Sequence, residues 1–479
     1  MRLTTRLTLT AFGLVSVFAT AAVWAQLPGL YGSDGIVPIA ETMEGVVRAN
    51  ARPWQVPTLL WLGWSDLALH LLLGACVLAS VCVTAGVAPR WALLALYVCW
   101  LSIVQVGAPF LNFQWDVMLL ETSLVFACLA PNGLRPFRAH ELPEPSRAVR
   151  FAVAVLACKV TLGSGLVKLA SGDESWRDLT ALTWHWWTQP LPTWTSVLAN
   201  EWPLWVQQAL CFVMFVLELP VPLLAFGPRR VRLVGAIGLM TMQAGLLAAG
   251  NYSFYNALTL VTALPLLDDA ALAKLWKGTA TLVEPRRSPV WAWGLAAAFA
   301  FLSVTAFSRR FVFEPPLAAV RERLEPFHAV NAYGAFAVMT KTRPEIIVEG
   351  SDDGVTWKAW EFPWKPGRLD RRPDFVAPWQ PRLDWQMWFA ALGTCEQNPW
   401  FLSFQLQLLK GSRDVQALLA SHPFGAPPKY LRATVWEYRF APLAERGVWW
   451  TRALTGPYCP PLALAPNGLL RRAEEVEAR

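Results

Sequence analysis

The first 310 residues contain repeated apolar runs that are long enough to cross a lipid bilayer, and no other feature constrains the fold as strongly. A crossing helix needs about 20 mostly apolar residues. The composition agrees, because 55% of the 479 residues are hydrophobic and only 16% are charged. Soluble domains have about 25% charged residues. We therefore expect an integral multi-pass membrane protein, with the lipid bilayer as one of its partners.

The apolar runs predict a polytopic α-helical membrane bundle of about eight or nine spans over residues 1–310. The first run follows Arg2 and Arg6, as in a signal peptide, but we favour an uncleaved anchor because the topology requires it. The eighth run is short enough to be re-entrant. The expected spans are residues 7–26, 58–84, 91–110, 113–130, 150–169, 204–226, 233–249, 253–267 and 289–308.

Basic residues gather in alternate loops between the expected spans. If every run spans, one side of the membrane receives Arg135, Arg138, Arg147, Arg150, Arg229, Arg230, Arg232, Lys274, Lys277, Arg286 and Arg287. The other side receives segment 170–203 and the C-terminal region. The positive-inside rule then predicts a cytoplasmic N-terminus and an extracytoplasmic C-terminal region. The net charge of +7 arises from these clusters and not from a basic and aromatic stripe, so we expect no nucleic-acid partner.

Several ionisable residues lie inside the expected spans, where they are costly unless paired. They are Asp66, His70, Asp116, Glu121, Lys159, Lys168 and Glu218. One interpretation is a polar intramembrane site that is catalytic or binds a substrate. The other is a set of ion pairs that connect helices, with Gly163-Ser164-Gly165 allowing close approach. We favour the ion pairs, because the sequence lacks the repeats and broken-helix pairs of transporters.

Residues 311–479 are richer in charge and proline and predict an extracytoplasmic, mostly β domain with a helical insertion. Asp353-Gly354 between two strand-like runs predicts a hairpin. The expected strands are Tyr333–Thr342, Glu345–Glu349, Val355–Phe362, Lys429–Phe440 and Val448–Ala453. The expected helices are Leu383–Leu392 and Trp400–Leu409.

Of the eight cysteines, six fall within expected spans and only Cys395 and Cys459 lie in the expected outer domain. In an oxidising compartment this pair is expected to form a disulfide, and the alternative is two unrelated buried thiols. No cysteine lies in a CxxC motif or a histidine-associated zinc spacing, so we expect no metal site. We also expect no cofactor, because no glycine-rich phosphate loop is present.

Two tryptophan-rich segments are candidate functional surfaces. His185 lies beside Trp184 in the outer loop, and its neighbours either anchor the loop at the membrane interface or leave Arg177, Asp178 and His185 as a polar cluster. In that cluster the histidine would titrate near neutral pH. Further on, Trp385 and Trp388 share a helical face. They belong either to a core-facing helix with an Arg382–Asp384 pair or to an exposed surface that binds a client protein.

Longer motifs extend over nearly the whole chain. They are Phe113-Gln114-Trp115-Asp116, Trp176-Arg177-Asp178-Leu179-Thr180, Thr188-Gln189-Pro190, Asn251-Tyr252-Ser253-Phe254, Asn331-Ala332-Tyr333-Gly334-Ala335-Phe336, Thr342-Arg343-Pro344-Glu345, Arg371–Pro378, Pro381–Ala390 and Trp449-Trp450-Thr451-Arg452. In this order they resemble the lipase maturation factor family. One departure is Trp186-Trp187, where the family pattern has an acidic residue.

The resemblance implies a function. Animal members of this family are endoplasmic-reticulum membrane proteins that help secreted dimeric lipases to fold, with the C-terminal region in the lumen. In a bacterium the periplasm would take the place of the lumen. The resemblance thus implies a non-enzymatic, chaperone-like maturation factor whose partner is a secreted client such as a lipase. No Gly-x-Ser-x-Gly motif is present, which argues against the chain being a lipase itself.

The alternative hypothesis is a membrane-embedded enzyme. Its site would use Asp66, His70, Asp116, Glu121, Lys159 and Lys168. Buried carboxylates and lysines with shifted pKa values suit such chemistry. The layout, with many spans before an outer β domain, is loosely similar to that of vitamin-K-dependent carboxylase.

Overall fold

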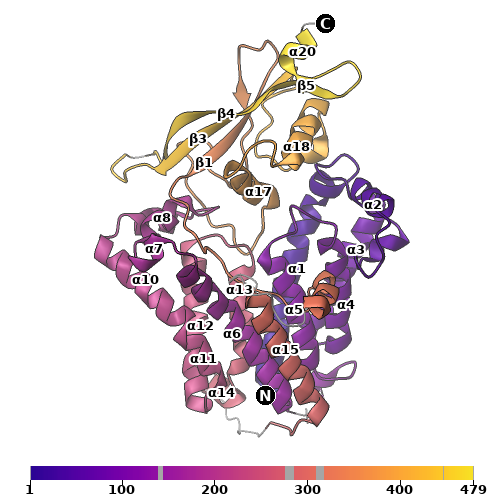
Figure 1. Ribbon diagram of the computed structural model, residues 1–479, viewed down its shortest axis with the longest axis vertical. Coiled ribbons are helices and arrows are strands. Elements are labelled where there is room, and N and C mark those ends of the chain that lie inside the picture. The colour runs from indigo at the N-terminus through magenta and orange to yellow at the C-terminus, as the bar shows by residue number, and fades with distance from the viewer. Residues whose placement is uncertain (1, 139–143, 276–284, 309–317, 446, 478–479) are drawn as a thin grey trace.

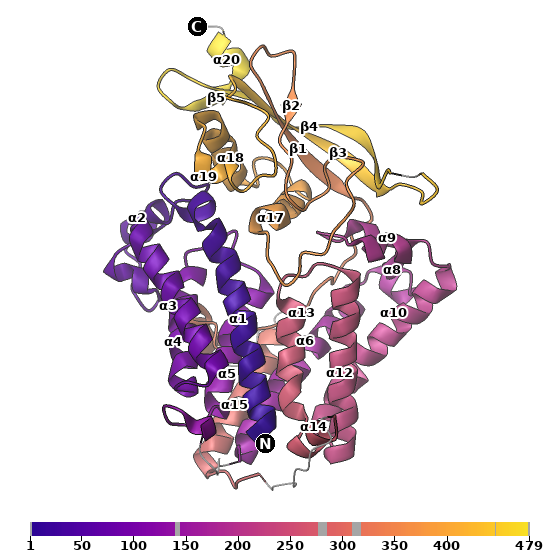
Figure 2. The same cartoon turned by 180° about the vertical axis from the view of Figure 1, so that it is seen from behind.

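The computed structural model describes residues 2–138, 144–275, 285–308, 318–445 and 447–477 (Figure 1). A long helical region occupies one end of the molecule, and a C-terminal domain containing the sheet occupies the other (Figures 1 and 2). The N-terminus lies at the end of the helical region that is farthest from this domain. The expected boundary at residue 310 lies outside the described residues.

The helical region is built mainly from long apolar helices. These are α1 (Arg2–Tyr31), α3 (Asp66–Ala85), α4 (Pro89–Val104), α5 (Gln114–Leu129), α6 (Arg147–Ala170), α10 (Leu204–Glu218), α12 (Arg229–Ala249), α13 (Tyr255–Ala263) and α15 (Val290–Ser308). Shorter helices connect them, namely α2 (Ile39–Arg48), α7 (Glu174–Arg177), α8 (Ala181–Thr188), α9 (Trp194–Asn200), α11 (Pro220–Leu223), α14 (Asp269–Leu275) and α16 (Ala318–Leu324).

Six of the described helical segments are long and apolar enough to cross a membrane. They are Leu3–Tyr31, Asp66–Ala85, Arg147–Ala170, Leu204–Phe226, Arg229–Ala249 and Val290–Phe307. The expectation of eight or nine spans is therefore met in part. The expected spans 91–110, 113–130 and 253–267 contain shorter helices, and 16 residues of α4 rise only about 24 Å against a hydrocarbon core of about 30 Å.

Side chains explain where several of these helices begin and end. The Ser65 hydroxyl accepts a hydrogen bond from the backbone N–H of Ala68 at the start of α3, and Ser146 does the same for Val149 at the start of α6. Gly86 ends α3 in the left-handed conformation with φ of 71°. Large apolar side chains on the outer faces of the spans are exposed, which suits contact with lipid.

The basic loops meet at the end of the helical region away from the C-terminal domain (Figure 2). Arg147 donates its backbone N–H to the carbonyl of Arg286, and Arg229 forms an ion pair with Asp268 at 2.7 Å. These contacts join loops that the sequence assigns to one side of the membrane.

The C-terminal domain contains a five-stranded antiparallel sheet in the order β2-β1-β3-β4-β5. Its strands are β1 (Pro344–Ser351), β2 (Lys358–Ala359), β3 (Tyr430–Phe440), β4 (Trp450–Leu464) and β5 (Leu470–Arg472). Helices α17 (Arg382–Ala391), α18 (Pro399–Lys410) and α19 (Arg413–Gln416) lie between the sheet and the helical region, and α20 (Ala473–Glu477) follows β5 (Figures 1 and 2).

The two faces of β1 have different neighbours, because side chains alternate along a strand. Ile346 and Val348 are buried in the same apolar core as Leu383 and Met387 of α17. Ile347 belongs to a separate small cluster on the other face of the sheet. The helices thus cover one face of the sheet and leave much of the other face open.

Two of the expected strands are wrong. Residues 333–342 form an irregular segment, because their polar groups bind the helical region instead of a neighbouring strand: Gly334 donates its N–H to Gln114 and Met339 donates to Asp173. The expected strand Val355–Phe362 shrinks to β2, which still pairs with β1 as a hairpin. The predicted helices Leu383–Leu392 and Trp400–Leu409 are confirmed as α17 and α18.

Candidate functional site

The motif residues gather where the C-terminal domain contacts the helical region. We call this contact the domain interface. On the helical side it contains Asp116, Glu121, His185, Gln189, Asn251 and Tyr252, and on the domain side it contains Asn331, Tyr333, Arg343, Val376, Arg382 and Trp388.

Arg382 at the start of α17 forms a buried two-pronged ion pair with Asp116 of α5. Its two terminal nitrogens lie 2.8 and 3.0 Å from the Asp116 carboxylate oxygens, and one of them also donates to the carbonyl of Phe110 at 2.6 Å. Both side chains are fully buried. Such paired geometry satisfies charges that water cannot reach. The ion pair therefore ties the first turn of α17 to the first turn of α5.

The expected pair between Arg382 and Asp384 is wrong, because each residue has a different partner. The Asp384 carboxylate accepts hydrogen bonds from the backbone N–H groups of Trp364 and Lys365, both at 2.8 Å. Burial raises the pKa of Asp384 to about 6, and those N–H groups oppose the rise. Asp384 thus organises the loop before α17.

Arg343 connects the domain to the end of α8. It is fully buried, and its guanidinium donates to the backbone carbonyls of Trp187, Gln189 and Pro190. The last carbonyls of a helix lack partners within the helix and favour a cation. The charge of Arg343 is balanced by Glu345 at 2.9 Å, which also lies 3.0 Å from Lys365. Arg343 therefore caps a helix of the other region.

His185 is buried in α8, and not exposed in a loop. Its Nε2 lies 2.6 Å from the hydroxyl of Tyr252, which donates in turn to Gln189. Burial, with a smaller effect from Lys168, lowers the pKa of His185 to about 3, so the ring stays neutral near pH 7. Arg177 and Asp178 are exposed at the end of α7. The expected polar cluster of these three residues is therefore wrong.

The exposed surface expected on α17 is also wrong, since Trp385 and Trp388 are 3% and 8% exposed. Trp388 donates its indole N–H to the carbonyl of Thr188, at the end of α8. Trp385 packs edge-on against Trp115 with ring centres 4.9 Å apart. The tryptophans therefore form the apolar part of the domain interface. Trp186 belongs to the pair Trp186-Trp187 that replaces the acidic residue of the family pattern. It is buried, and its indole N–H donates to the side-chain oxygen of Gln207.

The side chain of Asn251 forms hydrogen bonds with the backbone of the motif Arg371–Pro378 in the C-terminal domain. Its side-chain oxygen accepts from the N–H groups of Val376 and Ala377 at 2.7 and 3.1 Å, and its side-chain nitrogen donates to the carbonyl of Asp374 at 2.7 Å. All these groups belong to segments quoted above as motifs. One asparagine therefore fixes the position of an irregular loop without a charge.

The ionisable residues of the spans do not converge on one site. Lys159 pairs with Glu121, which also accepts a hydrogen bond from Tyr333 of the domain interface. Lys168 pairs with Glu218 at 2.5 Å. These are the helix-connecting pairs that the sequence favoured.

The other two ionisable candidates, Asp66 and His70, form hydrogen bonds with α1 or with the segment that follows it. Asp66 accepts from Ser33 at 2.9 Å, and His70 accepts from the indole of Trp24 at 2.8 Å. Both are exposed, unlike the buried Asp116 and Glu121. In the part of the chain that the structure describes, no three His, Cys, Asp or Glu side chains are grouped to hold a metal ion.

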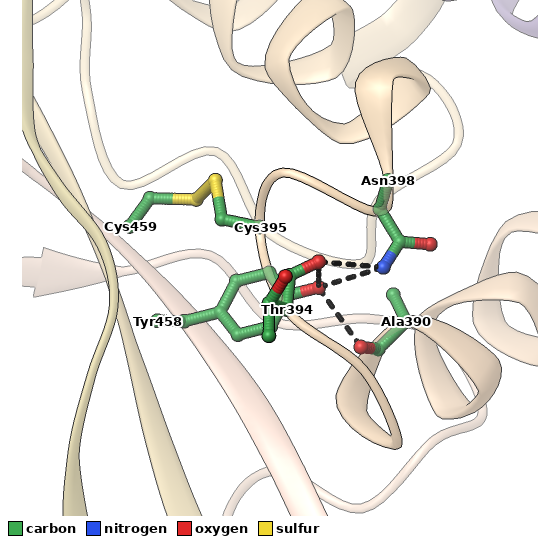
Figure 3. The surroundings of a disulfide bond; sticks show 6 residues. All are labelled: Ala390, Thr394, Cys395, Asn398, Tyr458 and Cys459. Atoms are coloured by element: carbon green, nitrogen blue, oxygen red, sulfur yellow. Dashed lines mark hydrogen bonds between the residues drawn. A yellow bond between two sulfur atoms is a disulfide. The ribbon is translucent and has the colours of Figure 1, made fainter.

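Cys395 and Cys459 form the expected disulfide, with Cα atoms 5.6 Å apart (Figure 3). Beside it, the Tyr458 hydroxyl donates to the carbonyl of Ala390 at 2.8 Å and accepts from Asn398 at 3.1 Å. The bond therefore joins the loop between α17 and α18 to β4. It connects the helical insertion, which contacts the helical region, to the sheet.

Tyr333, Arg343 and Asn251 lie within the sequence motifs, but the motifs alone do not indicate a role for them. Their partners are backbone groups or residues that are far away in sequence, so no local spacing indicates the contacts. One sequence signal is available: a polar residue among aromatic residues is expected to be buried, and buried polar groups almost always have a hydrogen-bond partner. Arg343 carries this signal most clearly, since it lies directly before a strand rich in apolar residues.

These features define a class: a multi-pass membrane protein whose C-terminal sheet domain is held on its helices by buried polar contacts. The family model described as the lipase maturation factor transmembrane domain matches residues 3–274, and the model described as the lipase maturation factor C-terminal domain matches residues 329–460. The chain belongs to the lipase maturation factor family. This confirms the resemblance seen in the sequence.

Relatives agree over almost the whole chain. Human lipase maturation factor 2 is 32% identical over 591 aligned positions, which cover 97% of this chain and 83% of the relative. Human lipase maturation factor 1 is 32% identical over 503 positions, which cover 95% of this chain and 87% of the relative. No solved structure matches the chain.

Proposed function

We propose that this protein is a membrane-bound maturation factor that assists the folding or assembly of secreted proteins, with lipases as the clients that its family name suggests. In this proposal residues 1–310 form the membrane part and residues 311–479 form an extracytoplasmic domain that meets the client. The observation that carries the proposal is the domain interface. Buried contacts from Arg343 and Arg382 hold the domain in one orientation at one end of the helices.

The proposed orientation rests on the basic loops. They lie at the end of the helical region opposite to the C-terminal domain, and positive loops favour the cytoplasm (Figure 2). Reporter fusions after Arg138 and after Arg372 test this orientation. Activity of a periplasmic or lumenal reporter only at the second position is expected. Activity of that reporter at the first position would reverse the proposed orientation.

The pairing of the intramembrane charges supports a non-catalytic role. Lys159 and Lys168 are each engaged by a carboxylate, and Asp116 is engaged by Arg382. Paired charges stabilise the bundle and keep these groups from acting as free acids or bases. The alternative of a membrane-embedded enzyme therefore has less support than the maturation factor.

The function can be tested by co-expressing the chain with a secreted lipase in a host that has no relative of it. The expected result is more active lipase in the secreted fraction at equal lipase synthesis. Arg382→Leu, which breaks the buried ion pair that holds the domain on the helices, should abolish the gain, whereas Arg48→Leu, at an exposed arginine of α2, should keep it. A gain in active lipase that persists with Arg382→Leu would contradict the proposal that the C-terminal domain must be fixed on the helices to assist the client. Absence of any gain with the unaltered chain would contradict a lipase client.

A further inference from the structure

Strand β4 has an open edge. It pairs with β3 along one side, but on the other side only Leu462–Leu464 pair with β5. Within the described residues, the backbone of Thr451–Gly456 makes no hydrogen bond to any segment except β3. Such an edge presents N–H and C=O groups with which another extended chain can pair. Pro457 lacks an N–H group, so the stretch that can pair freely ends at Gly456.

The side chains on this edge are accessible. All residues from Thr451 to Thr455 are exposed, and Leu454 is 59% exposed. Because side chains alternate along a strand, Arg452 and Leu454 lie on the same face. Across β3 their partners in register are Tyr438 and Trp436. An added strand beside β4 would therefore place one side chain near Arg452 and another, two residues away, near Leu454.

The same face contains a pocket of about 430 Å³, which lies on the side of the sheet that α17 and α18 leave open. Its lining includes Ile347, Glu349, Trp436 and Arg452. The pocket reaches from the middle of the sheet towards the open edge, because β1, β3 and β4 all contribute to it. It offers an indole and an aliphatic side chain beside charged groups, which is the composition of a surface that binds polypeptide.

Arg452 is held in place by aromatic residues and, in the described part of the chain, lacks an anionic partner. Its guanidinium lies 4.4 Å from the centre of the Trp436 ring and donates to the Tyr438 hydroxyl at 2.9 Å. Glu349, in the same pocket, is engaged by Arg432 at 2.8 Å. Among the described residues no carboxylate lies within ion-pair distance of Arg452. A guanidinium held in this way is prepared to bind a carboxylate from outside.

We propose that the open edge of β4 binds an extended segment of the client as an added strand, with an acidic side chain facing Arg452 and an apolar side chain two residues away facing Leu454. The inference rests on the proposed function, because the client supplies the segment. In strand addition the main chain supplies affinity and alternate side chains supply specificity. A second copy of this chain fits less well, since residues 451–456 contain Arg452 and no acidic residue.

The test uses the full chain in detergent micelles and a labelled synthetic peptide, Thr-Val-Thr-Glu-Thr-Val-Thr. This peptide is symmetric, so it presents the same side chains in either strand direction. Fluorescence anisotropy should show saturable binding. Arg452→Glu should weaken binding at least about tenfold, and a peptide with Lys in place of Glu should bind that variant more tightly than the unaltered chain. Arg472→Glu, an exposed arginine on β5, is the matched control and should leave the affinity unchanged.

Backbone pairing is tested with two N-methylated peptides, because successive N–H groups of a strand point to opposite sides. Methylation of one alternate set should abolish binding, and methylation of the other set should preserve it. Equal binding of both peptides would overturn strand addition. No binding of the unmodified peptide, or equal binding by the Arg452→Glu variant, would overturn the proposed site.

The remaining outcomes separate this inference from the proposed function. If the chain raises secreted lipase activity but fails to bind the peptide, the docking site is wrong and the maturation role stands. If it binds the peptide but has no effect on a secreted lipase, the maturation role is wrong. A dimer in light scattering that Arg452→Glu dissociates would assign the edge to a second copy and overturn the client segment.

Discussion

Buried charges have different partners in the two regions of the molecule. In the helical region Lys168 pairs with Glu218, which lies in the same bundle. In the C-terminal domain Arg343 and Arg382 instead bind groups of the helical region. The bundle can therefore neutralise most of its own charges. The undocked domain would leave Arg382 without its carboxylate and would leave Arg343, although paired with Glu345, without three carbonyl acceptors. The domain should thus depend on the bundle more than the bundle depends on the domain.

The largest expected effect comes from breaking the ion pair at the domain interface. Arg382→Leu leaves Asp116 buried without a cation, and breaking a buried pair costs about 3–5 kcal/mol. We expect loss of protease resistance in the C-terminal domain and little folded protein on size-exclusion chromatography. The double variant Arg382→Leu/Asp116→Leu should recover much of the yield, because no charge remains unpaired. Failure of the double variant to exceed the single one would contradict this account.

The comparable break inside the bundle is Lys168→Leu. This substitution leaves the Glu218 carboxylate, which is 2% exposed, without its cation. A lone charge at membrane depth costs about 2.5–3.5 kcal/mol on insertion scales. The yield of folded protein should fall, and the double variant with Glu218→Leu should restore it. Normal accumulation of Lys168→Leu together with loss of function would instead favour the enzyme hypothesis.

Loss of the disulfide should affect only the C-terminal domain. Replacing Cys395 and Cys459 with serine opens a loop between residues 64 positions apart, which costs about 2–4 kcal/mol in the chain-entropy picture. Limited proteolysis at rising temperature should show earlier cleavage in the domain and unchanged cleavage in the bundle. Reductant should have the same effect on the unaltered chain and none on the double serine variant. Equal destabilisation of both regions would contradict the expectation that the disulfide stabilises only the C-terminal domain.

The stability of the two regions should also depend on pH in different ways. The pKa of Asp384 rises from 3.8 to about 6 in the folded domain, so the domain binds this proton more tightly than the unfolded chain does. The contribution of Asp384 to the free energy of unfolding is fully present below pH 3.8 and is lost as the pH rises through 6. The loss is at most about 1.4 kcal/mol per pH unit. Asp384→Asn should flatten this part of the thermal-stability profile between pH 4 and 6.

His185 should act in the opposite direction. Its pKa falls from 6.5 to about 3 on folding, so its contribution is present above pH 6.5 and is lost as the pH falls towards 3. His185→Gln should therefore lessen the acid sensitivity of the helical region. A variant whose acid sensitivity matches that of the unaltered chain would show that other groups govern it.

The sequence predicted the parts of the fold that follow from local patterns. Apolar runs located the helices of the membrane region, and helical periodicity located α17. Local patterns failed where a distant partner decides the conformation. Residues 333–342 alternate like a strand, yet Tyr333 and Met339 find their partners in the helical region. In the same way nothing near Arg382 in sequence indicates Asp116 as its partner.

Arg343 also has a consequence for the order of biosynthesis. The carbonyl of Trp187 receives its hydrogen bond from a residue 156 positions later in the chain. At about 5–20 residues per second, the ribosome delivers Arg343 roughly 8–30 s after α8 has been made. During this interval, while α10, α12, α13 and α15 are still being made, the end of α8 lacks its cap. The end of α8 can therefore reach its final, capped state only after Arg343, in the last third of the chain, has been synthesised.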